Sequence, residues 1–223
     1  MIDRTLLDWG LAAVFLPVIG FALDWLLTHL GAAAYRAVAG VWSVEGSYEL
    51  NPRWQPEVDA GRRLSPRLLL TAAAMLALLV VLWQLCLALG GYDTAILGPE
   101  PGQAAFGFAV GALLLVQAPT VMSHAANLAQ FRALADPTAV SGGLRVRRWV
   151  AYRQSSGMYL RFAALWLALA ILSLQGFFAG GVFGCLSVAL RFRRLGEAAR
   201  ATAGAGAIEG PGEPPPEARA GSI

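Results

Sequence analysis

Three long stretches without an acidic or basic residue constrain this chain more than any other feature of its sequence. They cover residues 68–92, 102–131 and 162–190. A helix needs about 20 apolar residues to cross the roughly 30 Å hydrocarbon core of a bilayer, and each stretch meets this requirement. Hydrophobic residues form 57% of the chain and charged residues only 14%, which excludes a water-soluble enzyme. The sequence therefore predicts an all-α protein, a polytopic membrane helical bundle.

A fourth apolar segment, 6–30, is interrupted by Asp8 and Asp24. The 15 residues between the two aspartates would rise only about 22 Å as a helix, so at least one aspartate lies at or inside the membrane boundary. Asp3 precedes the segment, and the segment is longer than the apolar core of a typical signal peptide, which favours a retained anchor over a signal peptide. We therefore predict an integral membrane domain over 1–197 with four spans. Their predicted bounds are about 6–30, 68–92, 102–124 and 162–190.

The segments between the spans differ in character. The first loop includes a mildly apolar stretch, 33–44, in which we expect a short surface helix. In the third loop the sequence Ser155-Ser156-Gly157 lies between arginines and is interpreted as a turn. Residues 198–223 are rich in Ala, Gly, Pro and Glu, with little apolar surface to bury, and are expected to form a disordered tail.

The basic residues predict how the chain is oriented in the membrane. Cytoplasmic loops of membrane proteins carry an excess of basic residues, and with four spans the first and third loops would hold most of the arginines. The arginines of 191–194 conflict with this arrangement, because they would place a basic cluster outside the cytoplasm. A hairpin centred on Gly180-Gly181 would remove the conflict. The length of 162–190 nevertheless favours one tilted helix, since two crossings need about 40 residues.

A few polar residues fall within or beside the predicted spans, where their burial has a high energetic cost and a functional role is the first hypothesis. In the four-span arrangement they converge at the membrane depth of the first loop, and opposite charges there would stabilise each other. This predicted polar cluster, a candidate ligand or proton site, comprises Asp24, Thr28, Glu49, Asn51, His124 and Asn127.

Three interpretations of this cluster stay open: interfacial residues that fix helix ends, a proton relay or small-ligand pocket, and a metal site that would also use His29. The chain has only two histidines and no closely spaced ligand motif, so we predict no metal and no cofactor. No nucleophile elbow or phosphate-binding loop occurs, and no catalytic residue is predicted. The basic segment from Arg145 to Trp149 is typical of a juxtamembrane anchor rather than of nucleic-acid binding.

Glycines at intervals of four residues indicate close helix packing, because their missing side chains let another backbone approach. Two interpretations stay open: packing within the chain, and packing that joins the chain to a second copy or to a partner subunit. These glycines are Gly107 and Gly111 in the stretch 102–131, and Gly176, Gly180 and Gly184 in the stretch 162–190.

Two short motifs resemble a known group of proteins. The helix motif is Asp24-Trp-Leu-Leu-Thr28, and the turn motif is Glu49-Leu-Asn51-Pro52. The chain resembles small uncharacterised bacterial and archaeal multi-pass membrane proteins that carry an Asp-x-x-x-Thr helix and a Glu-x-Asn-Pro turn. The resemblance implies a helical bundle in which the Asn-Pro turn pins the loop after the first helix, and it implies no activity.

The sequence thus predicts a multi-pass protein of a bacterial cytoplasmic membrane with the lipid bilayer as its surroundings. The predicted function is non-enzymatic: a structural, accessory or assembly subunit that docks a second copy or another membrane protein through its glycine-rich helix face. The alternative is a small transporter or channel-like protein with a polar path at its cytoplasmic face. An enzyme acting on lipid is the third class.

Overall fold

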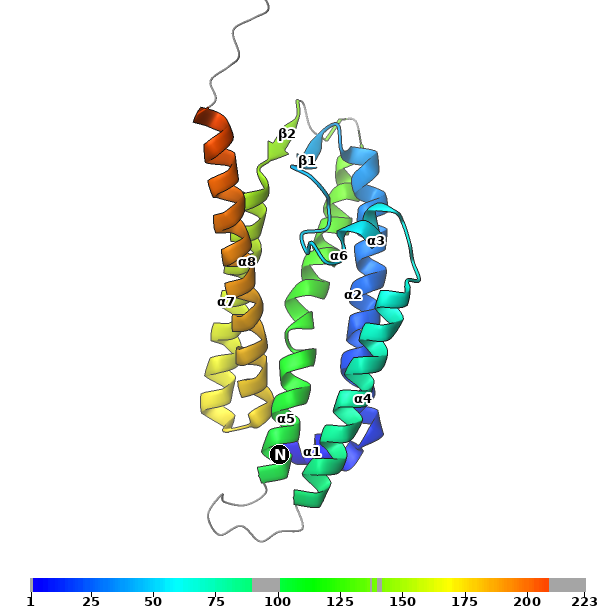
Figure 1. Ribbon diagram of the computed structural model, residues 1–223, viewed down its shortest axis with the longest axis vertical. Coiled ribbons are helices and arrows are strands. Elements are labelled where there is room, and N and C mark those ends of the chain that lie inside the picture. The colour runs from blue at the N-terminus through cyan, green and yellow to red at the C-terminus, as the bar shows by residue number, and fades with distance from the viewer. Residues whose placement is uncertain (1, 90–100, 137, 140–141, 209–223) are drawn as a thin grey trace, which may run out of the picture.

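The computed structural model describes residues 2–89, 101–136, 138–139 and 142–208, and most of them are helical (Figure 1). The helices run along one long axis, and a pair of three-residue parallel strands joins two of the loops. The elements are α1 (Ile2–Trp9), α2 (Leu11–Val38), β1 (Trp42–Val44), α3 (Gln55–Asp59), α4 (Pro66–Leu89), α5 (Pro101–Leu114), α6 (Gln117–Leu134), β2 (Leu144–Val146), α7 (Arg148–Ser173) and α8 (Gly176–Ile208).

The prediction of an all-α multi-pass membrane protein is confirmed. Within the described residues, five helical segments are long and apolar enough to cross a bilayer, whereas the sequence predicted four. Large apolar side chains face outwards on them; Leu70 and Leu78 of α4, for example, are 72% and 62% exposed. The five segments are Leu11–Val38, Pro66–Ala88, Pro101–Leu134, Arg148–Ser173 and Gly176–Ala203.

The difference of one span arises at 162–190, which is not a single helix. The predicted single tilted helix is wrong: the stretch belongs to α7 and α8, and the turn between them is at Leu174 and not at Gly180-Gly181, the centre of the alternative hairpin. Arg153 and Arg161 lie inside α7, so the uncharged stretch that begins at residue 162 includes only the second half of this helix. Arginines are tolerated there because their long side chains can extend along a helix to the membrane surface.

The first predicted span is also divided. Gly10 separates α1 from α2 with a positive φ of 51°, and the ring of Trp83 lies where a Cβ of residue 10 would be. The Trp83 indole N–H donates to the carbonyl of Leu7 at 3.3 Å, which fixes α1 against α4. Asp8 is therefore part of the short helix α1, and Asp24 alone of the two lies within the span of α2.

Three smaller boundaries also change. Residues 33–38 continue α2 and do not form a separate surface helix; the short helix of the first loop is α3. The expected turn at 155–157 is part of α7. The expected tail begins as helix, because α8 continues to Ile208, and its remainder lies outside the described residues.

The two ends of the bundle differ in charge. We name one the α1 end, where α1, the start of α5 and the turn between α7 and α8 lie; β1, β2 and α3 lie at the other (Figure 1). Arg4 is the only arginine at the α1 end among the described residues, and Arg161 is near the middle of α7. The others mark what we name the arginine-rich end: Arg36, Arg53, Arg62, Arg63, Arg67, Arg132, Arg145, Arg147, Arg148, Arg153, Arg191, Arg193, Arg194 and Arg200.

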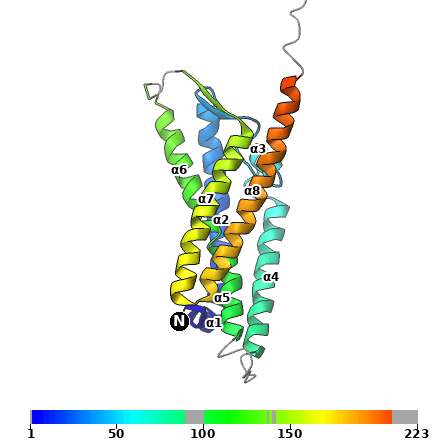
Figure 2. The ribbon, with the colours of Figure 1, turned by 90° about the vertical axis from the view of Figure 1, so that its left-hand side faces the viewer.

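The helices form two groups joined by α5. Helices α7 and α8 lie side by side, and α2 packs against α4 and α6 (Figures 1 and 2). At the α1 end, α5 packs closely against both α8 and α1. At the arginine-rich end the groups meet through the first loop, whose strand β1 pairs with β2 so that Trp42 lies opposite Leu144.

Candidate functional site

Helix α6 carries a polar stripe along one face. Its residues Gln117, Thr120, His124 and Asn127 follow one another at intervals of three, four and three, which places them above one another on a helix. The sequence analysis identified His124 and Asn127 but not the two residues that continue the stripe. The stripe begins at the break between α5 and α6, where Pro119 cannot donate a backbone hydrogen bond to Leu115.

Helix α2 supplies the partners of His124. Because α2 and α6 run in the same direction (Figure 1), Asp24 and Thr28, which are one turn apart, lie beside this histidine. Asp24 Oδ1 is 3.4 Å and Thr28 Oγ1 is 3.2 Å from His124 Nε2. The structure therefore places an acid and an imidazole in direct contact inside the bundle.

The first loop completes this contact from the arginine-rich end. Tyr48 Oη lies 3.3 Å from His124 Nδ1 and also hydrogen-bonds Asn127. Gly31 of α2 makes room for the phenol, since a Cβ at this position would overlap Tyr48 Oη. Burial raises the pKa of Tyr48, which keeps its hydroxyl protonated and able to donate a hydrogen bond to the imidazole.

Glu49, the next residue, is partly buried beside the cluster. Burial raises the pKa of its carboxyl from an ordinary 4.5 to about 6, and the Asp59 carboxylate contributes to this rise. The backbone N–H of Asn51, which donates to Glu49 Oε1 at 2.7 Å, and the guanidinium of Arg148 act in the opposite direction. The Glu49 carboxylate also acts electrostatically on Asp24.

Residues 45–51, which we name the bridging loop, connect the two groups of helices. Arg148 of α7 donates to the carbonyl of Glu49 at 3.2 Å, and Tyr152 of α7 donates to the carbonyl of Leu50 at 3.0 Å. Arg191 of α8 donates to Asn51 Oδ1 at 2.9 Å. Asn51 therefore faces α8 and not His124, and its role in the structure is to hold the bridging loop.

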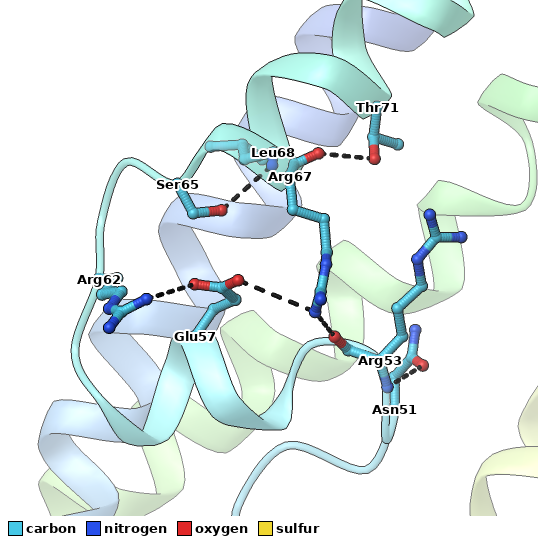
Figure 3. Close-up of polar contacts among 8 residues, drawn as sticks. All are labelled: Asn51, Arg53, Glu57, Arg62, Ser65, Arg67, Leu68 and Thr71. Carbon is cyan, nitrogen blue, oxygen red and sulfur yellow. Dashed lines mark hydrogen bonds and ion pairs between the residues drawn. The ribbon is translucent and has the colours of Figure 1, made fainter.

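The chain after the bridging loop is fixed by a second set of contacts (Figure 3). The Glu57 carboxylate lies 3.9 Å from a guanidinium nitrogen of Arg62 and 3.8 Å from one of Arg67. Arg67 also donates to the carbonyl of Arg53 at 2.6 Å. Ser65 caps α4 by accepting the backbone N–H of Leu68 at 3.1 Å. These contacts hold the loop over the polar cluster.

The contact between Asp24 and His124 is loose, and both side chains are partly exposed. Asp24 Oδ1 is buried and has no hydrogen bond to any residue that the structure describes, and the distances around His124 are all 3.2 Å or longer. The side chains of Asp24 and His124 are still 24% and 18% exposed. A carboxyl and an imidazole in this arrangement can share one proton and can exchange it with an entering molecule.

Two more members of the stripe have partners across the bundle. Thr120 hydrogen-bonds Tyr159 of α7, and Gln117 donates from Nε2 to the carbonyl of Pro17 in α2 at 3.0 Å. Sequence reasoning missed Tyr48, Thr120 and Tyr159. The spacing of polar residues on α6 was a signal for Thr120, whereas nothing local to Tyr48 or Tyr159 indicates what they face.

The predicted metal interpretation gains no geometric support, since no three of the His, Cys, Asp and Glu side chains described by the structure lie close enough together to hold an ion. His29 is separate from the cluster and packs against Trp25 with ring centroids 4.6 Å apart.

The predicted packing glycines all lie at the interfaces of α5 within the chain. A Cβ at Gly176, Gly180 or Gly184 would overlap backbone atoms of α5, and one at Gly111 would overlap the carbonyl of Phe177 in α8. Gly107 instead makes room for the carboxylate of Asp3. The face on which the docking hypothesis depends is therefore covered by the chain's own helix.

Asp3 holds the start of α8. Its carboxylate accepts the backbone N–H groups of Gly176 at 2.6 Å and Phe177 at 2.9 Å, and its own backbone N–H donates to Gln175 Oε1 at 3.1 Å. A carboxylate at a helix N-terminus satisfies unpaired donors and the positive end of the helix dipole. Sequence analysis could not identify this role, because the two partners are more than 170 residues apart in the chain.

Comparison with known proteins adds no relative. No family model matches the chain, and neither a curated protein nor a solved structure matches it.

Proposed function

We propose that this chain is a small transporter or channel-like protein of a bacterial cytoplasmic membrane, and that Asp24 and His124 bind the proton that it moves. The observation that carries the proposal is the 3.4 Å contact between these two side chains inside a bundle of apolar helices. Ionisable groups within a membrane protein are rare, and those that face the bundle interior mark proton and ion pathways.

The distribution of arginines supports entry of the proton from the cytoplasmic side. With five spans, the first loop, the third loop and the end of α8 all lie at the arginine-rich end. The conflict of the four-span arrangement disappears, and this end is the cytoplasmic one by the excess of basic residues. The bridging loop and Glu49 then form the cytoplasmic entrance to the cluster.

The polar stripe of α6 supports a proton path that ends near the middle of the bundle. From the arginine-rich end it reaches Gln117, where α6 begins. Beyond this point the core towards the α1 end is made of buried apolar side chains, which include Val14, Leu79, Phe106 and Val110. Polar residues that reach the middle of the bundle from one side only fit a carrier in one of its alternating-access states.

Proton flux into vesicles tests the proposal. The full chain is reconstituted in vesicles that contain a pH-sensitive dye, and a membrane potential drives proton entry. We expect flux above that of empty vesicles, and we expect Asp24→Asn and His124→Gln to abolish it. Asp8→Asn is the matched control, because Asp8 is exposed on α1 and, among the described residues, forms its ion pair with Arg4 at 3.7 Å. Wild-type flux equal to that of empty vesicles would refute the proposal.

The docking role predicted from the glycines stays a prediction. Its support is weaker than that of the transporter because α5 covers the glycine face within the chain. A partner or a second copy would have to use another surface of the bundle.

A further inference from the structure

The outer surface of α7 carries a gap between two arginines. Arg153, Gly157 and Arg161 follow one another at intervals of four residues and so form one row along the helix. A Cβ at Gly157 would have no other atom within 4 Å, which shows that this position opens away from the bundle. The row therefore consists of two cationic side chains on either side of an open glycine, and we name it the α7 notch.

The arginines of the α7 notch have no anionic partner within the protein. Both side chains are exposed, and neither makes an ion pair with any residue that the structure describes. Other arginines of this region do have such partners: Arg147 pairs with Glu45, and Arg193 with Glu197. The sequence itself has no acidic residue between Asp136 and Glu197, so α7 has no carboxylate of its own.

The depth of the α7 notch makes these charges notable. At 1.5 Å per residue, Arg153 lies about 30 Å and Arg161 about 18 Å along the helix from Ser173 at the α1 end. If Ser173 marks one edge of the hydrocarbon core, Arg153 is at the opposite edge and Arg161 is about 12 Å inside it. A cationic side chain at this depth must extend to the membrane surface or meet an anion.

The geometry of α7 directs Arg161 towards the α7 notch. Side chains of a helix lean towards its N-terminus, and the N-terminus of α7 is at the arginine-rich end. An Arg161 side chain that leans in this direction brings its guanidinium past Gly157 towards Arg153. Gln154, which is also exposed and lies next to Arg153, adds hydrogen-bond donors at the same place.

We propose that the α7 notch binds the headgroup of an anionic phospholipid of the leaflet at the arginine-rich end, with Arg153 and Arg161 on the phosphate and Gly157 providing the space. Guanidinium groups bind phosphate through paired hydrogen bonds, and here they do so beside the hydrocarbon core. Leu160 and Leu165, exposed on the same helix, contact the acyl chains. This inference is independent of the proposed proton site, which lies between α2 and α6.

Lipid retention measured by native mass spectrometry tests this site. The full chain is released from nanodiscs that contain phosphatidylglycerol and phosphatidylcholine, and the lipids that stay bound are counted. We expect wild type to retain phosphatidylglycerol preferentially. Arg161→Gln should lower this preference about fivefold, since each arginine near anionic headgroups contributes about 1 kcal/mol. Gly157→Leu should lower it similarly by filling the space, whereas Arg161→Lys should keep part of it.

Arg4→Gln is the matched control, since it removes an exposed arginine at the opposite end of the bundle. No preference in wild type, or an unchanged preference in Arg153→Gln/Arg161→Gln, would overturn the proposal. Loss of the bound phosphatidylglycerol in excess inorganic phosphate would overturn the assignment to a lipid, because it would show a site for free phosphate. Arg4, Arg153 and Arg161 are exposed and a Cβ at Gly157 meets no atom within 4 Å, so each variant should fold, and helix content by circular dichroism checks this.

Discussion

The two ends of the bundle are held together by different kinds of contact. At the α1 end, backbone meets backbone: glycines of α8 lie directly on α5, and Asp3 receives two backbone N–H groups within 2.9 Å. At the arginine-rich end, the short β1–β2 pair and the side-chain contacts of the bridging loop make the connection, and the distances around His124 are 3.2 Å or more. Closely packed backbones permit little adjustment, whereas long side chains can rearrange.

This difference indicates which end responds to a change of charge. The contacts of the bridging loop with α7 and α8 depend on Arg148, Tyr152 and Arg191, and the loop also carries Tyr48 and Glu49 to the polar cluster. Under the proposed function, protonation of the cluster would act on the contacts that can rearrange, and the α1 end would keep the helices in register.

The largest effect is expected where the packing is closest. In Gly180→Leu the new Cβ would overlap the carbonyl oxygen of Phe108, a backbone atom that can move only with α5. We expect a loss of more than about 3 kcal/mol in the free energy of unfolding, measured by denaturant titration in mild detergent. Gly157→Leu on α7 is the control and should change little, since its Cβ meets no atom within 4 Å. Equal free energies of unfolding for the two variants would contradict the close packing of Gly180 on α5, and with it the difference between the ends.

The second prediction concerns pH at the arginine-rich end. The pKa of Glu49 is raised in the folded protein to about 6 from 4.5, so the folded state binds the proton more tightly than the unfolded chain. The contribution of this group to stability is therefore full below pH 4.5 and is lost as the pH rises to about 6. The loss amounts to about 2 kcal/mol.

Glu49→Gln should remove this part of the pH dependence, since the amide does not titrate. The comparison is a pair of unfolding curves measured between pH 4 and pH 7 for each protein. Glu197→Gln, which removes an exposed carboxylate of α8, serves as the control. A slope that survives in Glu49→Gln would show that another group causes it.

A third prediction concerns the cap of α8. Asp3→Asn removes the negative charge that meets two backbone N–H groups, and we expect a loss of about 1 to 2 kcal/mol in the free energy of unfolding. Asp8→Asn, in an exposed pair with Arg4, should cost well under about 1 kcal/mol. If the two variants were equally stable, the cap would be unimportant at this end.

The sequence predicted the fold class because long apolar stretches leave a chain few alternatives to spanning a bilayer. The bounds of the spans were predicted poorly where charged residues lie inside helices. Arg153 and Arg161 are part of α7. Because the predicted span 162–190 contains no charged residue, the part of α7 that holds these arginines was left out and one span was not predicted. The turn residues Leu174 and Gln175 include no glycine or proline, whereas Gly180 and Gly181 lie inside α8, where Gly180 packs on α5 and Gly181 on Leu115 and Trp166.

The candidate site was predicted in part. Asp24, Thr28, His124 and Asn127 come together because polar residues of neighbouring spans at similar depth have few other partners. Tyr48 and Tyr159 could not be predicted, because their partners depend on how the bridging loop and α7 fold over the cluster. Asn51 was placed with the cluster by depth alone, but its hydrogen bond to Arg191 directs it to α8.

The smallest effect is expected at the unmarked turn of the α1 end. Leu174 has a φ of 54°, a left-handed conformation that is unfavourable for a residue with a side chain, and it is 88% exposed. Leu174→Gly removes this strain without loss of buried contacts, so it should raise the free energy of unfolding by up to about 1 kcal/mol. Ser173→Gly, at the last residue of α7, should lower it instead, because glycine favours the helical conformation less than serine does. A stabilised end that leaves proton flux unchanged would strengthen the contrast, since the α1 end would then serve only to hold the helices.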